Sequence, residues 1–180
     1  YPDRTLALVY LDGTGIGQAW HQPYREERRR RLGNGFDRWM NLSIRRRIPD
    51  EEAEMRRLAW GVDFADSTRG TELAAAMDRP FRININDKAN RLIGDEMGHW
   101  DEDALASRCA ALVVPTLVVH GAEDPRPAWA VDSMVAALPD ATALVLADAG
   151  HVPWLEAGDR FFEPLRDFLR RVTVPGWVVR

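Results

Sequence analysis

Three short apolar segments mark the two ends of the chain. They cover residues 5–12, 116–120 and 141–146, are rich in Val, Leu and Ala, and are each followed by glycine or by a turn. Apolar runs of this length without polar alternation are typical of strands buried on both faces of a parallel sheet. We therefore predict three parallel strands.

Two helical patterns accompany these strands. Between the second and third strands, apolar residues recur at the i, i+3, i+4 and i+7 spacing of an amphipathic helix: Val131, Met134, Val135 and Leu138. After the third strand a second apolar stripe predicts a closing helix: Phe161, Leu165, Phe168, Leu169 and Val172. Alternation of strands and helices predicts an α/β fold for both ends of the chain.

The middle of the chain has a different character. It shows no convincing strand pattern, and its helix-length stretches are broken by LGNG, IPD, GVD and DRP. It predicts a helical insertion, with Asp50 and either Ser67 or Thr68 as N-caps of two helices. The predicted division is a core of residues 1–17 and 108–174, a helical cap of residues 18–107 and a tail of residues 175–180.

Composition excludes several classes of partner. With 24 basic and 28 acidic residues the net charge is −4, so we expect no attraction to nucleic acid or to an anionic membrane. The arginine runs at 28–31 and 45–47 stand next to acidic residues, which predicts solvated helix faces. The single cysteine, Cys109, excludes an internal disulfide or a CxxC metal site and favours a cytoplasmic location.

Two polar residues follow predicted strands at the edge where α/β sheets build their sites. Asp124 comes after the second strand in VVPTLVVHGAEDPRPAW, and His151 comes after the third in LVLADAGHVPWLE. Either residue alone is typical of a turn or a hydrogen-bonded loop. Together, at the ends of neighbouring strands, they predict a carboxylate that holds an imidazole as a general base.

The remaining histidines and two tryptophans have simpler interpretations. His120 is expected to pack or hydrogen bond near the strand end, and His21 and His99 to lie exposed in the cap. The HxxxD spacing that begins at His120 is not a zinc signature, so we expect no metal and no cofactor. Trp129 and Trp154 lie close in sequence to the acid and the histidine and are candidates for the walls of a substrate pocket.

These segments resemble a known family. LVVPTLVVHGAEDP and LVLADAGHVPWLE are similar to the acid and histidine segments of the α/β-hydrolase fold, and YPDRTLALVYLDGTG is similar to its sixth strand, which leads into a helical cap. The tryptophan-rich cap with ANRLI resembles proline iminopeptidase-type members. The resemblance implies the C-terminal part of the hydrolase sheet, its last three parallel strands, with Asp124 as the triad acid and His151 as the base.

The nucleophile of such a triad is not visible in the chain. None of the candidates has the flanking glycines of a GxSxG elbow: Ser43, Ser67, Ser107, Ser133 and Cys109. We expect the elbow in about 100 residues upstream, in an N-terminal half of the same protein, so that the chain alone is inactive.

The resemblance implies a serine hydrolase that acts on an ester or on a small amide or peptide, including removal of an N-terminal residue. A small molecule or a peptide is then the substrate, and the N-terminal half is the partner. Two alternatives stay open: a dehalogenase or epoxide hydrolase with an upstream aspartate nucleophile, and a non-catalytic binding protein of the same fold.

Overall fold

The computed structural model describes residues 4–78 and 86–172, so the predicted tail of residues 175–180 lies outside the described residues. Strands β1 (Leu8–Leu11), β2 (Thr116–Gly121) and β3 (Ala141–Leu146) form a parallel sheet in the order β1-β2-β3. The three predicted strands are confirmed, and the first is shorter than the predicted residues 5–12.

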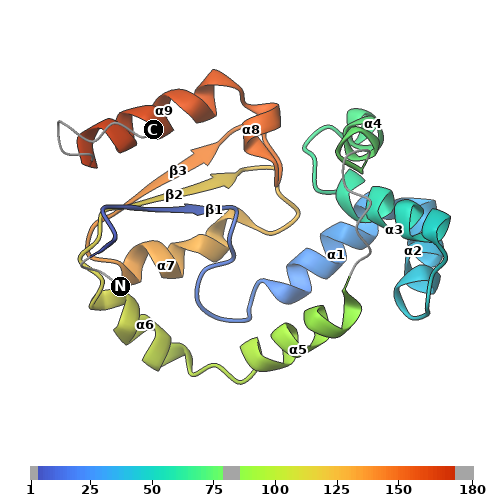
Figure 1. Ribbon diagram of the computed structural model, residues 1–180, viewed down its shortest axis with the longest axis horizontal. Coiled ribbons are helices and arrows are strands. Elements are labelled where there is room, and N and C mark those ends of the chain that lie inside the picture. Colours follow the sequence, from blue (N-terminus) through green and yellow to red (C-terminus); the bar gives the residue numbers. More distant parts are fainter. Residues whose placement is uncertain (1–3, 79–85, 173–180) are drawn as a thin grey trace.

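Helices occupy the chain between β1 and β2 and again after β2. The insertion contains α1 (His21–Leu32), the 3-10 turn η2 (Gly33–Gly35), α2 (Phe36–Ser43), α3 (Pro49–Gly61), α4 (Ser67–Asp78), α5 (Asp87–Met97) and α6 (Glu102–Ala110). The 3-10 turn η3 (Ala128–Val131) and α7 (Asp132–Ala137) follow β2, and α8 (Pro153–Glu156) and α9 (Asp159–Val172) follow β3. In Figure 1 the chain leaves the sheet after β1, runs through α1 to α6, and returns at β2. In the described part of the chain, no helix is both long and apolar enough to cross a membrane.

The central strand β2 organises the core, and all six of its residues are buried. Helix α9 lies on one face of the sheet and α7 on the other (Figure 1). On the α9 face, Phe161 and Phe168 pack with Leu117 and Val119 of β2. Four residues of the predicted apolar stripe, Phe161, Leu165, Phe168 and Val172, thus face the core, as their spacing predicts. The fifth, Leu169, is 40% exposed, so the prediction is wrong for this residue.

Two helix starts differ from the predictions. Helix α3 begins at Pro49, whose fixed φ suits the first helical position, and the Glu51 side chain accepts the Ile48 N–H at 3.2 Å. Asp50 therefore lies in the first turn and is not the N-cap. Before α4, the Asp66 carboxylate accepts the N–H of Thr68 at 2.9 Å, so Asp66 performs the capping that was predicted for Ser67 or Thr68.

The prediction of solvated arginine faces is wrong for two side chains. Arg47 is fully buried, donates to the Leu42 carbonyl at 2.6 Å and pairs with Asp87 at 2.7 Å. Arg31 is nearly buried, and its guanidinium donates to the Phe64 carbonyl at 3.0 Å and to the Glu123 carbonyl at 2.7 Å. Arg47 thus binds a carbonyl in the last turn of α2, and Arg31 binds loop carbonyls. Such carbonyls need partners from elsewhere in the chain, and these partners come into place only on folding.

The α9–sheet contact generates a stability prediction. Phe168→Ala should lower the free energy of unfolding by about 3–5 kcal/mol, because it removes a buried ring and leaves a cavity. Phe162→Ala on the same helix is the matched control, since that ring is 37% exposed; it should cost about 1 kcal/mol. Urea unfolding of both variants measures the difference, and equal losses would contradict the assigned buried face.

Candidate active site

The predicted acid and the predicted base meet at the carboxyl end of the sheet. Asp124 follows β2 in a turn in which its N–H donates to the Gly121 carbonyl at 3.2 Å, and its side chain is fully buried. His151 follows β3, and its Nδ1 lies 2.7 Å from Oδ2 of Asp124. An ionised carboxylate accepts from N–H, so this contact places a proton on Nδ1 and leaves Nε2 for another partner.

Backbone contacts hold the two loops together. A Cβ on Gly121 would lie 2.1 Å from the oxygen of Gly150, and a Cβ on Gly150 would lie 2.3 Å from the oxygen of Asp63. The Asp63 oxygen also accepts the N–H of His151 at 2.7 Å. The segment after α3 therefore orients the backbone of His151 directly.

Arg126 completes the surroundings of the acid, and sequence reasoning did not single it out. Its N–H and its Nη1 donate to Oδ1 of Asp124 at 2.8 and 3.1 Å, and Nη1 also reaches Oδ1 of Asp63 at 3.1 Å. Its guanidinium lies over the Tyr24 ring, 4.7 Å from the centroid. The sequence feature that could have indicated Arg126 is its position, two residues after the predicted acid Asp124.

These contacts keep Asp124 ionised. Burial by itself raises the pKa of Asp124, but the hydrogen bond from His151 and the charges of His151 and Arg126 outweigh burial, so the pKa lies below its ordinary value. With Oδ1 bound to Arg126 and Oδ2 bound to His151, both carboxylate oxygens are oriented. Asp124 is thus a charged acceptor, held in one position, for the imidazole.

Asp12, which sequence reasoning also missed, ends β1 beside this pair. It adopts a left-handed φ of 48°, which Asp tolerates better than most residues, and it is buried. Its Oδ1 accepts the Gly121 N–H at 3.3 Å, while no hydrogen-bond partner for its buried Oδ2 occurs in the described part of the chain. Burial raises the pKa of Asp12 to about 7, with the charge of Asp124 adding to the effect and that of His151 opposing it. The available sequence signal was an acid at the end of the first predicted strand, residues 5–12.

The other histidines lie where they were expected, with one difference. His120 is fully buried, and its Nδ1 lies 2.8 Å from the Gly121 carbonyl, as the packing interpretation predicts. Burial lowers the pKa of His120, which favours a neutral ring. His99 is exposed in the cap, whereas His21 is half-buried and stacks on Trp20 at 3.9 Å.

The same residues include a set of metal-ligand types. One ligand atom from each of Asp12, Asp124 and His151 lies within 4.8 Å of the other two, a grouping that can hold a divalent cation. Within this group Nδ1 of His151 and Oδ2 of Asp124 already bind each other, so a cation would compete with this hydrogen bond. A cation would also stand beside the Arg126 guanidinium, which already neutralises Asp124.

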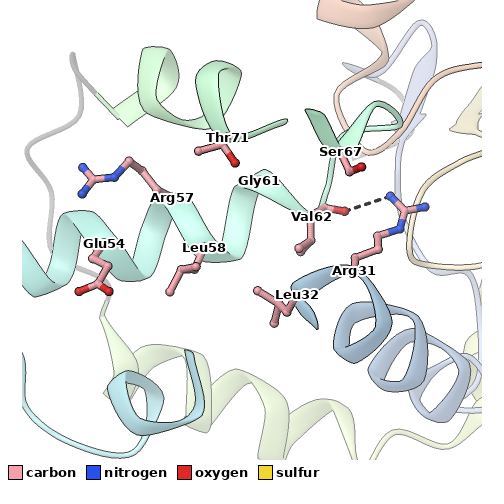
Figure 2. Close-up of a pocket in the computed structure, with 9 residues that line it drawn as sticks. All are labelled: Arg31, Leu32, Glu54, Arg57, Leu58, Gly61, Val62, Ser67 and Thr71. Atoms are coloured by element: carbon pink, nitrogen blue, oxygen red, sulfur yellow. Dashed lines mark hydrogen bonds between the residues drawn. The ribbon is translucent and has the colours of Figure 1, made fainter. Parts of the chain in front are cut away.

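A cavity of about 260 Å³ lies in the helical insertion, between α1, α3 and α4 (Figure 2). Figure 2 shows the guanidinium of Arg31 directed at the Val62 carbonyl, to which it donates at 3.0 Å. Neither Asp124 nor His151 lines this cavity. It lies within the helical insertion and is separate from Asp124 and His151.

The two tryptophan candidates for the pocket wall are partly exposed. Trp129 lies in η3 and is 50% exposed, and Trp154 lies in α8 and is 38% exposed, with its ring 6.5 Å from that of Phe161. Their role in a pocket stays a prediction. The cap contributes a different tryptophan, Trp39, to a cavity of about 440 Å³ between α1 and α2, where the Arg28 guanidinium lies 4.5 Å from its ring.

The described serines are engaged away from His151. The hydroxyls of Ser43, Ser107 and Ser133 donate to backbone carbonyls at 2.8 to 2.9 Å, and Ser67 lines the cap cavity. None of these contacts is the serine–imidazole hydrogen bond of a complete triad.

A three-stranded parallel sheet with a buried acid after one strand and its histidine after the next defines an α/β protein of the hydrolase type. The chain belongs to the alpha/beta hydrolase family, whose model matches residues 3–163. No curated protein matches the chain by sequence.

Solved structures are similar in fold. A thermophilic esterase from Thermogutta terrifontis is 23% identical with a TM-score of 0.61, over 97% of this chain and 59% of that protein. A meta-cleavage product hydrolase (CumD) is 17% identical with a TM-score of 0.59, over 95% of this chain and 58% of that protein. A proline iminopeptidase from Mycobacterium smegmatis is 13% identical with a TM-score of 0.55, over 92% of this chain and 57% of that protein. The chain therefore spans less than two thirds of the length of these proteins.

The Arg126 contacts generate a second stability prediction. Arg126→Met should lower the free energy of unfolding at neutral pH by about 3–5 kcal/mol, because it leaves the buried Asp63 and Asp124 without their counter-ion. Because folding lowers the pKa of Asp124, its ionised form stabilises the fold at pH values above the pKa of the unfolded state. This stabilisation is lost as the pH falls. The difference in stability between wild type and variant should therefore shrink in acid.

Arg160→Met is the matched control for this variant, since the Arg160 side chain is 52% exposed. It should change the free energy of unfolding by about 0.5 kcal/mol or less in urea titrations. Similar losses of stability for the two variants would show that Arg126 does not stabilise the fold by pairing with the buried Asp63 and Asp124.

The buried Asp12 generates a prediction of pH dependence. A carboxyl whose pKa rises from 3.8 to about 7 on folding contributes stability below pH 4 that is lost as the pH rises towards 7. Asp12→Asn cannot ionise at this position, so the variant does not lose this stability as the pH rises. The free energy of unfolding of the variant minus that of the wild type should therefore rise by about 3 kcal/mol between pH 4 and pH 8.

Asp148→Asn is the control for Asp12→Asn, because Asp148 also has a positive φ, of 55°, but its side chain is 88% exposed. Its effect on stability should not vary with pH. Urea unfolding at both pH values gives the comparison, and a pH-independent effect of Asp12→Asn would contradict the raised pKa.

Proposed function

We propose that this chain carries the acid and the base of a Ser–His–Asp hydrolase that cleaves esters or small amides. The observation that carries the proposal is the 2.7 Å hydrogen bond between Nδ1 of His151 and Oδ2 of the buried, ionised Asp124. Membership of the alpha/beta hydrolase family supports it, because members of this fold place acid and histidine after successive strands in this chain order.

The reaction proceeds by acyl transfer. Nε2 of His151 takes the proton of the nucleophilic hydroxyl as its oxygen bonds to the substrate carbonyl, and Asp124 stabilises the imidazolium. The imidazolium then gives this proton to the leaving group as the acyl–leaving-group bond breaks. Water hydrolyses the acyl-enzyme with the same base, which restores the hydroxyl.

The nucleophile lies outside these 180 residues, in the N-terminal half of the protein. The hydroxyls of Ser43, Ser107 and Ser133 donate to backbone carbonyls, and Ser67 lines the cavity of the helical insertion. The chain spans 59% of the length of the T. terrifontis esterase, which is compatible with a further segment. The edge strand β1 supports this partner, since Leu8 and Leu11 are 39% and 37% exposed there and further strands would pair with it.

An ester is the first candidate substrate, since the T. terrifontis esterase is similar over 97% of the chain. Removal of an N-terminal residue is the second, because the likeness to the proline iminopeptidase covers 92%. The partly exposed Trp129 in η3 and Trp154 in α8, which follow the acid and histidine loops along the chain, would form apolar walls for either substrate. The buried free thiol of Cys109 is compatible with a cytoplasmic site of action.

The test uses the full-length protein that contains this chain. His151→Ala should lower the hydrolysis of a short-chain p-nitrophenyl ester by about 1,000-fold or more, because the nucleophile loses its base. It should also abolish labelling by a fluorophosphonate, which reacts with activated serines. Parallel assays with proline p-nitroanilide compare the two substrate classes.

His99→Ala is the matched control, since His99 is an exposed cap residue whose Nδ1 faces the Asp95 carbonyl. It should retain full turnover. Full activity of His151→Ala would refute the assignment of the base. Turnover without a fluorophosphonate adduct on the wild type would indicate an aspartate nucleophile, and neither turnover nor adduct would indicate a binding protein.

A further inference from the structure

We propose that Asp12 is a second carboxylate acting on the imidazole of His151, a positioning residue that stabilises the imidazolium together with Asp124. The inference rests on the proposed function, since it concerns the same base. It adds a residue that directly follows β1 to an acid from the loop after β2 and a histidine from the loop after β3.

The geometry supports this role. Asp12, Asp124 and His151 each present a ligand atom within 4.8 Å of the other two. The side chain of Asp12 is held from one end only, by the Gly121 N–H on Oδ1. Its Oδ2 is buried without a hydrogen-bond partner among the described residues, so no described donor binds this oxygen.

The charged neighbours of Asp12 explain why it responds to the imidazole. After β2 they are Asp124 and Arg126, and after β3 His151; His120 lies behind Asp124, with Nε2 3.8 Å from its Oδ2. Arg126 is already engaged with the oxygens of two other aspartates. The group left to balance an ionised Asp12 is therefore the imidazolium of His151, which forms as the nucleophile loses its proton.

This arrangement makes the contribution of Asp12 dependent on pH. Burial raises the pKa of Asp12 to about 7, so the carboxyl is neutral in mild acid and charged in mild base. A neutral carboxyl gives little stabilisation to an imidazolium, whereas a carboxylate within about 5 Å gives a substantial one in a buried site. The benefit to catalysis should therefore appear only above neutrality.

The test compares kcat/KM for a p-nitrophenyl ester between the full-length wild type and Asp12→Asn across the pH range. The ratio of wild type to variant should be near one at about pH 5.5 and should rise to about tenfold at about pH 8.5, as Asp12 ionises. Infrared spectroscopy adds a readout independent of activity: a protonated carboxyl band that disappears around neutral pH in the wild type and is missing in Asp12→Asn.

Asp148→Asn is again the matched control, with an exposed aspartate of similar backbone conformation, and it should leave both readouts unchanged. A ratio that is independent of pH would overturn the proposal, since a purely structural role predicts it. If His151→Ala is inactive while the Asp12→Asn ratio stays flat, this inference alone fails. If His151→Ala is fully active, the proposed function itself fails.

Discussion

The direct contact between the backbones of Gly121, Gly150 and Asp63 is the constraint on which the site depends. No side chain fits at either glycine, so the end of β2, the loop after β3 and the segment after α3 approach one another through their backbones. This approach allows the Asp63 carbonyl to bind the N–H of His151. The helical insertion therefore takes part in orienting His151.

The charges around His151 and Asp124 determine the protonation state of each buried carboxyl. Arg126 is shared between Asp63 and Asp124, and Asp124 also receives the imidazole N–H, so its pKa falls in spite of burial. Burial raises the pKa of Asp12 to about 7, because its single weak N–H donor and the charges of His151 and Arg126 do not outweigh burial. Two aspartates within 4.8 Å of the same histidine thus differ in protonation because of their partners.

Local patterns predicted much of the fold and the centre of the site. The strands, the buried face of α9 and the packed position of His120 follow from short-range periodicity. Asp124 and His151 could be paired because consecutive parallel strands end at one edge of a sheet. The helix starts at Pro49 and Asp66 were missed because several good capping residues compete within a few positions, and the backbone geometry selects among them.

The sequence by itself determined which segments form the sheet and which residues follow its strands, because these properties depend on neighbours a few positions away. Only the tertiary structure decided that Asp12 lies beside the acid–histidine pair, that Arg126 bridges two aspartates and that Arg31 is buried. The contacts that place them join residues 109, 63 and 92 positions apart, respectively. Short-range sequence patterns do not encode contacts between residues so far apart in the chain, because burial and charge pairing are determined only when the loops pack together.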